Sequence, residues 1–427
     1  MNSTFFLVVA CIAILLQSLV LYLALFGPGI GYKISMPSSA PLDSEDFLRM
    51  LESLTDAQAH EHCCIDVLTN GNVYYEAELA AIRDARETIN LEAYIFQRGE
   101  VARRFVEALT ERARAGVKVN LVLDAIGSFA SWESYFAELR QAGGRVVWYH
   151  PLRWYTLPNI NNRTHRELII VDGRAGFIGG SGFADHWLIG NTKNPAWRDT
   201  MFRVEGSAVL GLQATFAENW LEASGEILAG TEYFPRPETK NEEAAALIVN
   251  SSPSVGGSTR ARILYQTLLA SAQSNIKITT PYFLPDKSAR AEMVRAIRER
   301  GVEIHIIAPG KHSDHLLTRR SSRRLYGDLL KAGAKIYEYE AAMIHAKTMI
   351  VDDLWSVVGS TNFDNRSFGI NDEVNLAARN AELAARIAED FARDLTESRA
   401  VSYQEWNNRS IFERAHEWVG WVLERQQ

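Results

Sequence analysis

The strongest constraint on the fold is an internal repeat. Residues 165–185 read HRELIIVDGRAGFIGGSGFAD, and residues 345–365, 180 positions later, read HAKTMIVDDLWSVVGSTNFDN. Other pairs of segments match in the same order: 89–96 with 276–283, 115–124 with 300–310, and 141–150 with 331–340. A chain that repeats itself in this way is expected to build two copies of one structural unit.

Each copy alternates between short apolar, β-branched stretches and longer amphipathic ones, the pattern of strands that alternate with helices. Closing helices are expected at residues 209–221 and 383–395. We therefore predict an α/β fold of two duplicated lobes, each a mixed, largely buried β-sheet flanked by helices. The lobes are expected at residues 61–231 and 249–400, joined by a linker at residues 232–248, and should pack face to face about a pseudo-twofold axis.

The N-terminal part stands outside the repeat. Residues 5–26 are apolar apart from Gln17 and Ser18, long enough for one helix across a bilayer, and nothing marks a cleaved signal peptide. We expect a single-pass transmembrane anchor at residues 1–30, in the cell's inner (cytoplasmic) membrane, with the rest of the chain on the cytoplasmic side. Residues 31–60 should form a linker and an amphipathic helix that Ser44 caps. Asn70-Gly71 suggests a β-hairpin.

Three further segments are candidates for contact with lipid. Residues 319–331, RRSSRRLYGDLLK, form a basic stretch that either faces anionic headgroups or is balanced by neighbouring carboxylates. Trp154, Tyr155 and Leu157 either form an aromatic lip just before the expected strand that follows His165 or pack inside the first lobe. Residues 401–427 predict an amphipathic C-terminal helix, which either lies on a bilayer or packs across the lobes.

Composition restricts the possible partners. The formal net charge is −7, so the chain as a whole is not suited to bind nucleic acid, and an anionic substrate must be met by local positive groups. Three cysteines at positions 11, 63 and 64 give neither a disulfide framework nor the spacing of metal ligands. We expect no metal, cofactor or nucleic-acid partner, and the sequence makes no prediction of the oligomeric state.

The second copy of the repeat carries reactive groups in a specific arrangement. His345 and Lys347 are two residues apart at the start of an expected strand, so their side chains point to the same face. An imidazole beside a fixed cation suits a phosphate, because one group can attack or protonate while the other holds the oxygens.

This duplicated His-x-Lys-x4-Asp pattern, followed by Gly-Ser-x-Asn, resembles the phospholipase D superfamily. The segments NLEAYIF, WRDTMFRVEG, ITTPYFLPD and GSTNFDNRSFGINDEVNL look most like its bacterial cardiolipin synthase branch, and the resemblance covers residues 70–395. It implies a metal-independent transfer in two steps, in which one histidine forms a phosphohistidine and the other protonates the leaving alcohol and deprotonates the incoming one.

The resemblance also implies a role for each matching residue. His165 would be the nucleophile and His345 the general acid and base, with Asp199 and Glu373 as carboxylates that orient the two imidazoles. Asp172 and Asp352 are the motif aspartates, more structural than catalytic in character. The groups expected to bind phosphate are Lys347, Asn362, Ser360 and Ser181.

The first copy departs from the family pattern at two positions. Glu167 stands where the motif has lysine, and Gly182 where it has asparagine. Three interpretations remain open at this point. Glu167 turns aside, pairs with Arg163 or Arg166, or binds substrate hydroxyls, while the second copy holds the phosphate; or His345 is the nucleophile; or the protein binds lipid without catalysis.

We predict a phosphatidyltransferase of the cardiolipin synthase type. It would move a phosphatidyl group from a glycerophospholipid in the bilayer, for example phosphatidylglycerol, to a lipid hydroxyl. The alternatives are a phospholipase D-type phosphodiesterase that hydrolyses a phospholipid or another phosphodiester, and a silent lipid-binding relative. Fold-level likeness does not separate these activities.

Overall fold

The computed structural model describes residues 3–26, 30–34, 40–153, 161–237, 244–253, 259–410 and 413–414. Up to residue 237 the helices and strands are, in order, α1 (Ser3–Phe26), α2 (Glu45–Thr55), β1 (Ala59–Thr69), α3 (Gly71–Asp84), β2 (Thr88–Ala93), α4 (Glu100–Arg114), β3 (Lys118–Asp124), α5 (Ala137–Gln141), β4 (Arg145–Tyr149), β5 (Leu168–Val171), β6 (Ala175–Gly179), β7 (Thr200–Glu205) and α6 (Ala208–Ser224).

The remaining elements repeat much of this order. They are β8 (Ala244–Ser251), α7 (Arg260–Ser271), β9 (Asn275–Thr279), α8 (Lys287–Arg300), β10 (Glu303–Pro309), α9 (Leu316–Arg324), α10 (Tyr326–Ala332), β11 (Lys335–Tyr339), β12 (Thr348–Val351), β13 (Trp355–Gly359), α11 (Asn365–Gly369), β14 (Glu373–Arg379), α12 (Ala381–Thr396), β15 (Ser398–Val401) and α13 (Tyr403–Asn407). We call the elements up to α6 the first half and those from β8 onward the second half.

The strands form one mixed sheet, which confirms the α/β prediction at this level. Its order is β15-β11-β10-β9-β12-β13-β14-β8-β1-β7-β6-β5-β2-β3-β4. The halves meet where β1 and β8 pair antiparallel, with Ala59 opposite Leu247. On either side of this junction come antiparallel strands and then a parallel trio: β2, β3 and β4 in the first half, and β9, β10 and β11 in the second.

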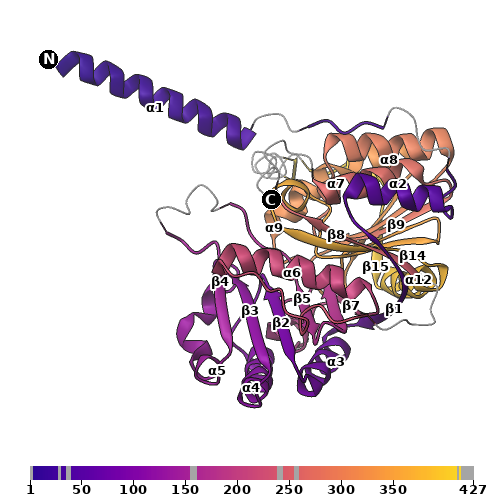
Figure 1. The fold of residues 1–427 in the computed structure, drawn as a ribbon. Helices are drawn as coiled ribbons and strands as arrows, with labels where there is room; N and C mark the ends of the chain where they lie inside the picture. Colours follow the sequence, from indigo (N-terminus) through magenta and orange to yellow (C-terminus); the bar gives the residue numbers. More distant parts are fainter. Residues whose placement is uncertain are drawn as a thin grey trace.

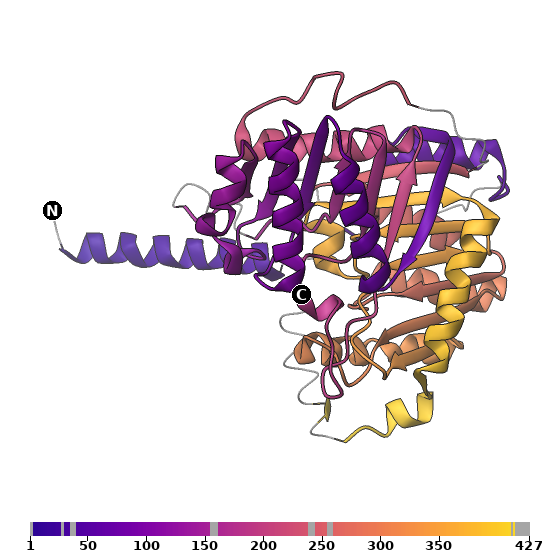
Figure 2. The ribbon, with the colours of Figure 1, turned by 90° about the horizontal axis from the view of Figure 1, so that it is seen from below.

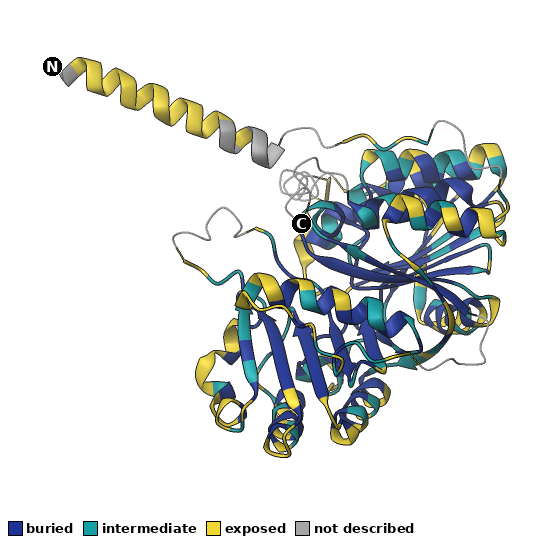
Figure 3. Ribbon diagram, viewed as in Figure 1, coloured by how far each residue is buried: buried dark blue, intermediate teal, exposed yellow. Residues whose placement is uncertain are grey.

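Alternate residues of the central strands face different cores. In β5, Ile169 packs under α3 and α4, whereas Ile170 faces a core shared by both halves. In β12, Met349 packs under α2, α7 and α8, and Ile350 faces the shared core. Helices α6 and α12 therefore lie between the strands of the two halves, and the other large helices cover the outer faces (Figures 1 and 2). The strands are accordingly the most buried part of the molecule (Figure 3).

Helix α1 projects away from the rest of the chain, and its described side chains are exposed (Figures 1 and 3). Within the described ranges, no helix combines the length and the apolar character needed to cross a membrane. The prediction of a single-pass anchor at residues 1–30, and with it the assignment to the inner membrane, is therefore wrong.

Two local predictions had different outcomes. Ser44 caps α2 as expected, because its hydroxyl accepts a hydrogen bond from the Phe47 N–H at 3.2 Å. The β-hairpin at Asn70-Gly71 is wrong, since β1 ends at Thr69 and α3 begins at Gly71. Tyr75, Leu79 and Ile82 follow a helical spacing, and all three are buried in the core of the first half, which favours the helix.

Other predicted segments lie partly outside the described residues. Strand β8 begins at Ala244, inside the expected linker at residues 232–248, of which residues 238–243 are not described. Of the expected C-terminal helix, α13 is described, whereas Ile411, Phe412 and every residue beyond Arg414 lie outside the described part. The proposed aromatic lip at Trp154, Tyr155 and Leu157 also lies outside it.

Candidate active site

Two short parallel bridges between the halves position the histidines. In the first, the His165 N–H donates to the Asp372 carbonyl and the Asp372 N–H donates to the Arg163 carbonyl, both at 2.9 Å. In the second, the Arg198 N–H donates to the Met343 carbonyl at 2.8 Å, and the His345 N–H donates to the Arg198 carbonyl at 2.7 Å. Each histidine is thereby fixed beside the residue that follows the bridge in the other half.

Those following residues are the two predicted carboxylates. The His165 Nδ1 lies 3.1 Å from the Glu373 carboxylate, and the His345 Nδ1 lies 2.9 Å from Asp199 Oδ2. Both carboxylates are fully buried. A carboxylate at Nδ1 fixes the orientation of an imidazole and leaves Nε2 for chemistry. The structure therefore brings four predicted residues together, in pairs that each join one half to the other.

Aromatic rings enclose these pairs. Trp187 and Trp197 lie with their ring centres 5.4 Å from that of His345, and Tyr94 lies 5.4 Å from His165. The Trp187 indole N–H also donates to Asp199 Oδ2 at 3.0 Å, which holds the carboxylate that in turn holds His345. Sequence reasoning missed Trp187. The two copies match as far as GFAD (182–185) and NFDN (362–365), but Trp187 has no similar residue in the second copy. The repeat therefore did not mark it.

Burial and charge set the protonation of the second pair. Burial and the neighbouring Lys347 ammonium lower the pKa of His345, although Asp199 opposes them. Burial acts to raise the pKa of Asp199, but the hydrogen bond and charge of His345 outweigh it and hold that pKa below its usual range. Free His345 is thus a neutral imidazole near pH 7, beside an ionised Asp199.

Lys347 is buried and reaches from the second half onto the first. Its Nζ lies 2.9 Å from the His345 carbonyl oxygen and 3.2 Å from the His345 Nε2. A Cβ at Gly180 would lie 2.5 Å from this Nζ, so the lysine occupies space that only glycine leaves open. Ser360 stands at the position of the second copy that matches Gly180, and its hydroxyl donates to Glu373.

The other predicted phosphate ligands differ in their surroundings. Asn362 is 4% exposed, and its Oδ1 has no hydrogen-bond partner among the described residues. The Ser181 hydroxyl donates to the Tyr74 hydroxyl at 2.8 Å, on the side of α3. Asn362 is therefore available to a ligand, whereas Ser181 is engaged within the first half.

Glu167 has turned toward the backbone of its own half. Its Oε1 accepts hydrogen bonds from the N–H groups of Tyr94 at 3.2 Å and Ile95 at 3.3 Å. The neighbouring arginines bind other acceptors: Arg163 binds the His150 carbonyl at 3.1 Å, and Arg166 binds Glu218 at 2.7 Å. Of the partners considered from the sequence, the two arginines are thus engaged elsewhere.

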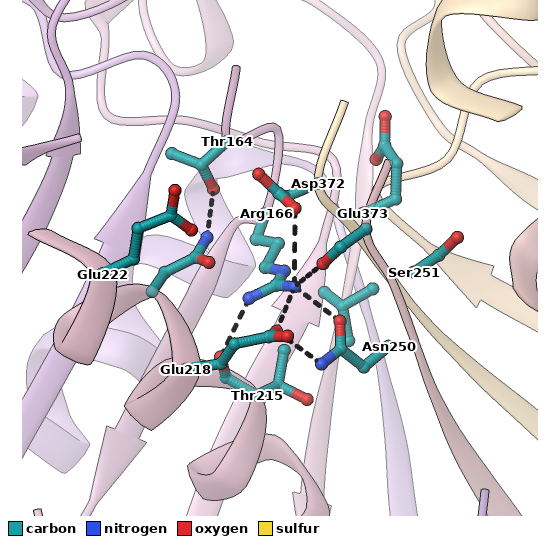
Figure 4. A network of polar contacts seen from close by, with 12 residues as sticks. Thr164, Arg166, Thr215, Glu218, Glu222, Asn250, Ser251, Asp372 and Glu373 are labelled. Atoms are coloured by element: carbon teal, nitrogen blue, oxygen red, sulfur yellow. Dashed lines mark hydrogen bonds and ion pairs between the residues drawn. The ribbon is translucent and has the colours of Figure 1, made fainter. Parts of the chain in front are cut away.

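Arg166 ties this region of the two halves together (Figure 4). It is fully buried and donates to the Thr215 carbonyl at 2.9 Å and to Asn250 at 2.5 Å, and it lies 3.9 Å from Asp372. It therefore connects the His165 segment with α6, with β8 and with the residue that precedes Glu373. The sequence suggested Arg166 only as a partner of Glu167, because an arginine between His165 and Glu167 has no counterpart in the second copy.

The motif aspartates lie at the far ends of the strands that follow the histidines. Asp172 accepts hydrogen bonds from the N–H groups of Glu87 and Thr88 at 2.8 and 2.9 Å, and Asp352 accepts from those of Ser274 and Asn275 at 2.8 and 2.9 Å. Both residues have a φ of 52°. Their carboxylates therefore anchor the starts of β2 and β9.

This geometry predicts a loss of stability in the Asp352→Ala variant. The change removes charge-assisted hydrogen bonds to the backbone N–H groups of Ser274 and Asn275 and should lower the free energy of unfolding by about 1–3 kcal/mol. Chemical denaturation followed by circular dichroism measures it. Asp353→Ala is the matched control, because Asp353 has the same φ of 52° but pairs with Lys277 at the surface. Equal losses in the two variants would contradict the anchoring role.

The basic stretch is largely neutralised within the second half. Arg319 and Arg323 of α9 lie 3.3 and 3.5 Å from the fully buried Glu338 carboxylate of β11. Arg399 lies 2.8 Å from the same carboxylate. Two of the four arginines thus serve an internal ion-pair network, which favours the second of the interpretations considered for this stretch. Among the described residues, no group of three or more His, Cys, Asp or Glu side chains is arranged to hold a metal ion.

Comparison with known proteins identifies the family. The family model described as "Cardiolipin synthase, PLD-like domain" matches residues 79–194 and 265–395. Cardiolipin synthase 1 of Bacillus anthracis is 33% identical over 397 residues, which cover 90% of this chain and 77% of that protein. The major cardiolipin synthase of Bacillus subtilis strain 168 is 34% identical over 388 residues, which cover 90% of this chain and 80% of that protein.

Among solved structures, the crystal structure of phosphatidylserine synthase from Haemophilus influenzae is similar with a TM-score of 0.67 and 13% identity, covering 89% of this chain and 99% of that one. At this level of identity the likeness concerns the fold alone. The sequence matches go further and confirm the resemblance that the motifs predicted: this chain belongs to the cardiolipin synthase family of phospholipase D-like proteins.

Proposed function

We propose that this protein is a phosphatidyltransferase of the cardiolipin synthase type. It transfers a phosphatidyl group from one phosphatidylglycerol to a hydroxyl of another, and the products are cardiolipin and glycerol. The family match supports this activity. The observation that carries it is the crossed pairing of the histidines, each held at Nδ1 by a buried carboxylate of the other half, with one lysine beside them.

The reaction proceeds in two steps. The His165 Nε2 attacks phosphorus, a P–N bond forms, and the P–O bond to glycerol breaks while His345 as imidazolium gives its proton to the leaving oxygen. The neutral His345 then takes the proton of the acceptor hydroxyl, whose oxygen attacks phosphorus and breaks the P–N bond. One proton is given and one is taken, so the enzyme returns to its starting state.

The first step needs His345 in its protonated form, and the substrate helps to supply it. In the free protein Lys347 contributes to the lowered pKa of His345. An anionic phosphodiester bound by Lys347 offsets that positive charge and raises the pKa again.

We further propose that the two halves, which contain the predicted lobes at residues 61–231 and 249–400, are duplicates of each other related by a pseudo-twofold axis. The equivalent strand orders on the two sides of the β1–β8 junction support this view. The site then lies on the axis. Each lobe accordingly supplies one histidine, and also the carboxylate that orients the histidine of the other lobe.

Product analysis tests the proposed function. Purified protein is mixed with phosphatidylglycerol as the only phospholipid, and the lipids are analysed by mass spectrometry. We expect cardiolipin and an equal amount of glycerol. His305→Ala is a matched control, because His305 lies on β10 and pairs with Glu303, and it should form cardiolipin as the unaltered protein does. Phosphatidic acid as the sole product would indicate a hydrolase, and no product at all would contradict catalysis.

A further inference from the structure

The first half has lost both phosphate-binding residues of its motif, yet the replacements fit each other. A Cβ at Gly182 would lie 2.6 Å from the Ile95 carbonyl oxygen and 3.1 Å from Glu167 Oε1. An asparagine at position 182, as at the matching Asn362, would therefore collide with the backbone that holds the Glu167 carboxyl. Glu167 and Gly182 form one coupled substitution, and the geometry of the carboxyl depends on the glycine.

The two oxygens of Glu167 have different surroundings. Oε1 is bound by two backbone N–H groups, those of Tyr94 and Ile95. Oε2 has no hydrogen-bond partner among the described residues, and it is buried, since Glu167 is only 4% exposed. A buried polar atom that is left unpaired is costly, and at a functional site a hydrogen bond to a ligand would remove that cost. The matching Asn362 has an unpaired buried oxygen as well.

Charge determines what such a carboxyl can bind. Burial raises the pKa of Glu167 well above its usual range, although the two N–H groups and Lys347 act against it. Burial therefore favours the protonated, neutral form of this carboxyl. Because both bonds from the backbone end on Oε1, the proton belongs on Oε2, which makes that oxygen a hydrogen-bond donor. A neutral donor does not repel a phosphodiester anion, as a carboxylate would.

Glu167 lies close to the reacting histidines. Glu167 is two residues from His165 and so lies on the same side of its segment. It also interacts electrostatically with Lys347, the cation of the other half. Lys347 itself lies against Gly180 of the first half.

We propose that Glu167 binds the substrate phosphodiester through an Oε2 hydroxyl, which donates to a non-bridging oxygen opposite the one held by Lys347. The inference rests on the proposed function and assigns a substrate-binding role to the residue that departs from the motif. The first half therefore still binds the phosphate, but with a neutral hydrogen-bond donor in place of an ammonium.

Two variants at position 167 separate the possible forms of this contact. Gln keeps a neutral donor and an acceptor for the backbone, whereas Ala removes both. The probe is a phosphonate analogue of phosphatidylglycerol, in which a P–C bond replaces the bond that breaks, so that binding is measured without turnover. We expect Glu167→Ala to raise the Kd about 10- to 100-fold, the usual effect of losing a hydrogen bond to a charged group, and Glu167→Gln to raise it about threefold.

The pH dependence of the Kd distinguishes this binding role from a purely structural role of Glu167, which would not change it. The ionisable groups that face Glu167 are Lys347 from the second half, Glu92 and Tyr94 on the β2 side, and His165 on its own segment. As pH rises, Glu167 loses its proton and Lys347 its charge, and both changes weaken binding. The Gln variant keeps only the second change, so its Kd should rise less steeply with pH than that of the unaltered protein.

Infrared spectroscopy checks the proton directly. The band of a protonated carboxyl that disappears in Glu167→Gln should shift when the phosphonate binds. Glu78→Gln provides the matched control, because burial also raises the pKa of Glu78 and its band should not respond to the ligand. Thermal melts show whether the variants remain folded.

Three results would overturn the proposal: equal Kd values for Glu167→Ala and the unaltered protein, an equally large loss in Gln and Ala, or no carboxyl band that responds to the ligand. These results are independent of turnover. If the unaltered protein forms no cardiolipin while the binding differences hold, the proposed function fails and the assignment of Glu167 to a phosphodiester stands.

Discussion

Single replacement of His165 or His345 by alanine is expected to lower the rate of cardiolipin formation by at least about 10³-fold. Each histidine is the sole group in its role, as nucleophile or as general acid and base, and either contribution alone is of this size. Each Nδ1 is already fixed by Glu373 or Asp199, so neither ring can substitute for the other. Steady-state rates measured by mass spectrometry give the loss directly.

An activated substrate separates the two roles. A phosphodiester with a p-nitrophenol leaving group does not need to be protonated, so the first step can proceed without a general acid. His345→Ala should then release one equivalent of p-nitrophenol in a burst and accumulate phosphohistidine, because no base remains for the second step. His165→Ala should show no burst. The reverse pattern would assign the nucleophile to His345, and bursts in both variants would contradict a single nucleophile.

Lys347→Met is expected to lower kcat/KM by about 100- to 1,000-fold, the second-largest effect. The ammonium is buried and lies within hydrogen-bond distance of His345, and the first half has no lysine at the matching position. A preorganised positive charge in a buried site stabilises the developing negative charge of the transition state by several kcal/mol. Methionine keeps the length and the apolar stem, so the loss reports the charge.

Lys277→Met is the matched control for this experiment. Lys277 lies on β9 next to β12, and its ammonium pairs with Asp353 rather than with the histidines. We expect its kcat/KM to stay within about twofold of the original value, since surface ion pairs contribute little. A Lys347→Met variant as active as Lys277→Met would contradict the view that one lysine serves both halves.

The sequence predicted the parts of this protein that depend on local patterns. Alternation of β-branched stretches with amphipathic ones predicted the mixed α/β sheet, and the predicted helix at residues 383–395 corresponds to α12. The two histidines, Asp199 and Glu373 were found because motifs keep reactive residues at fixed spacings. The structure places all four together, although their catalytic roles remain predictions.

The remaining features depend on contacts between distant segments. The bridge between Thr164 and Asp372 decides that His165 meets Glu373 rather than Asp199, and no spacing within either copy contains that information. Trp187 and Arg166 act only through such contacts. The error at Asn70 has a local cause, because a turn signal was given more weight than the helical spacing of the apolar residues that follow.

The central claim is that catalysis passes through a covalent phosphohistidine at a site built from both halves. The most direct measurement is rapid acid-free quenching of the protein during turnover of phosphatidylglycerol, followed by peptide mapping with mass spectrometry. We predict a phosphatidyl group on the peptide that contains His165, and its absence in His165→Ala. A protein that forms cardiolipin with no modified histidine in any peptide would contradict this account.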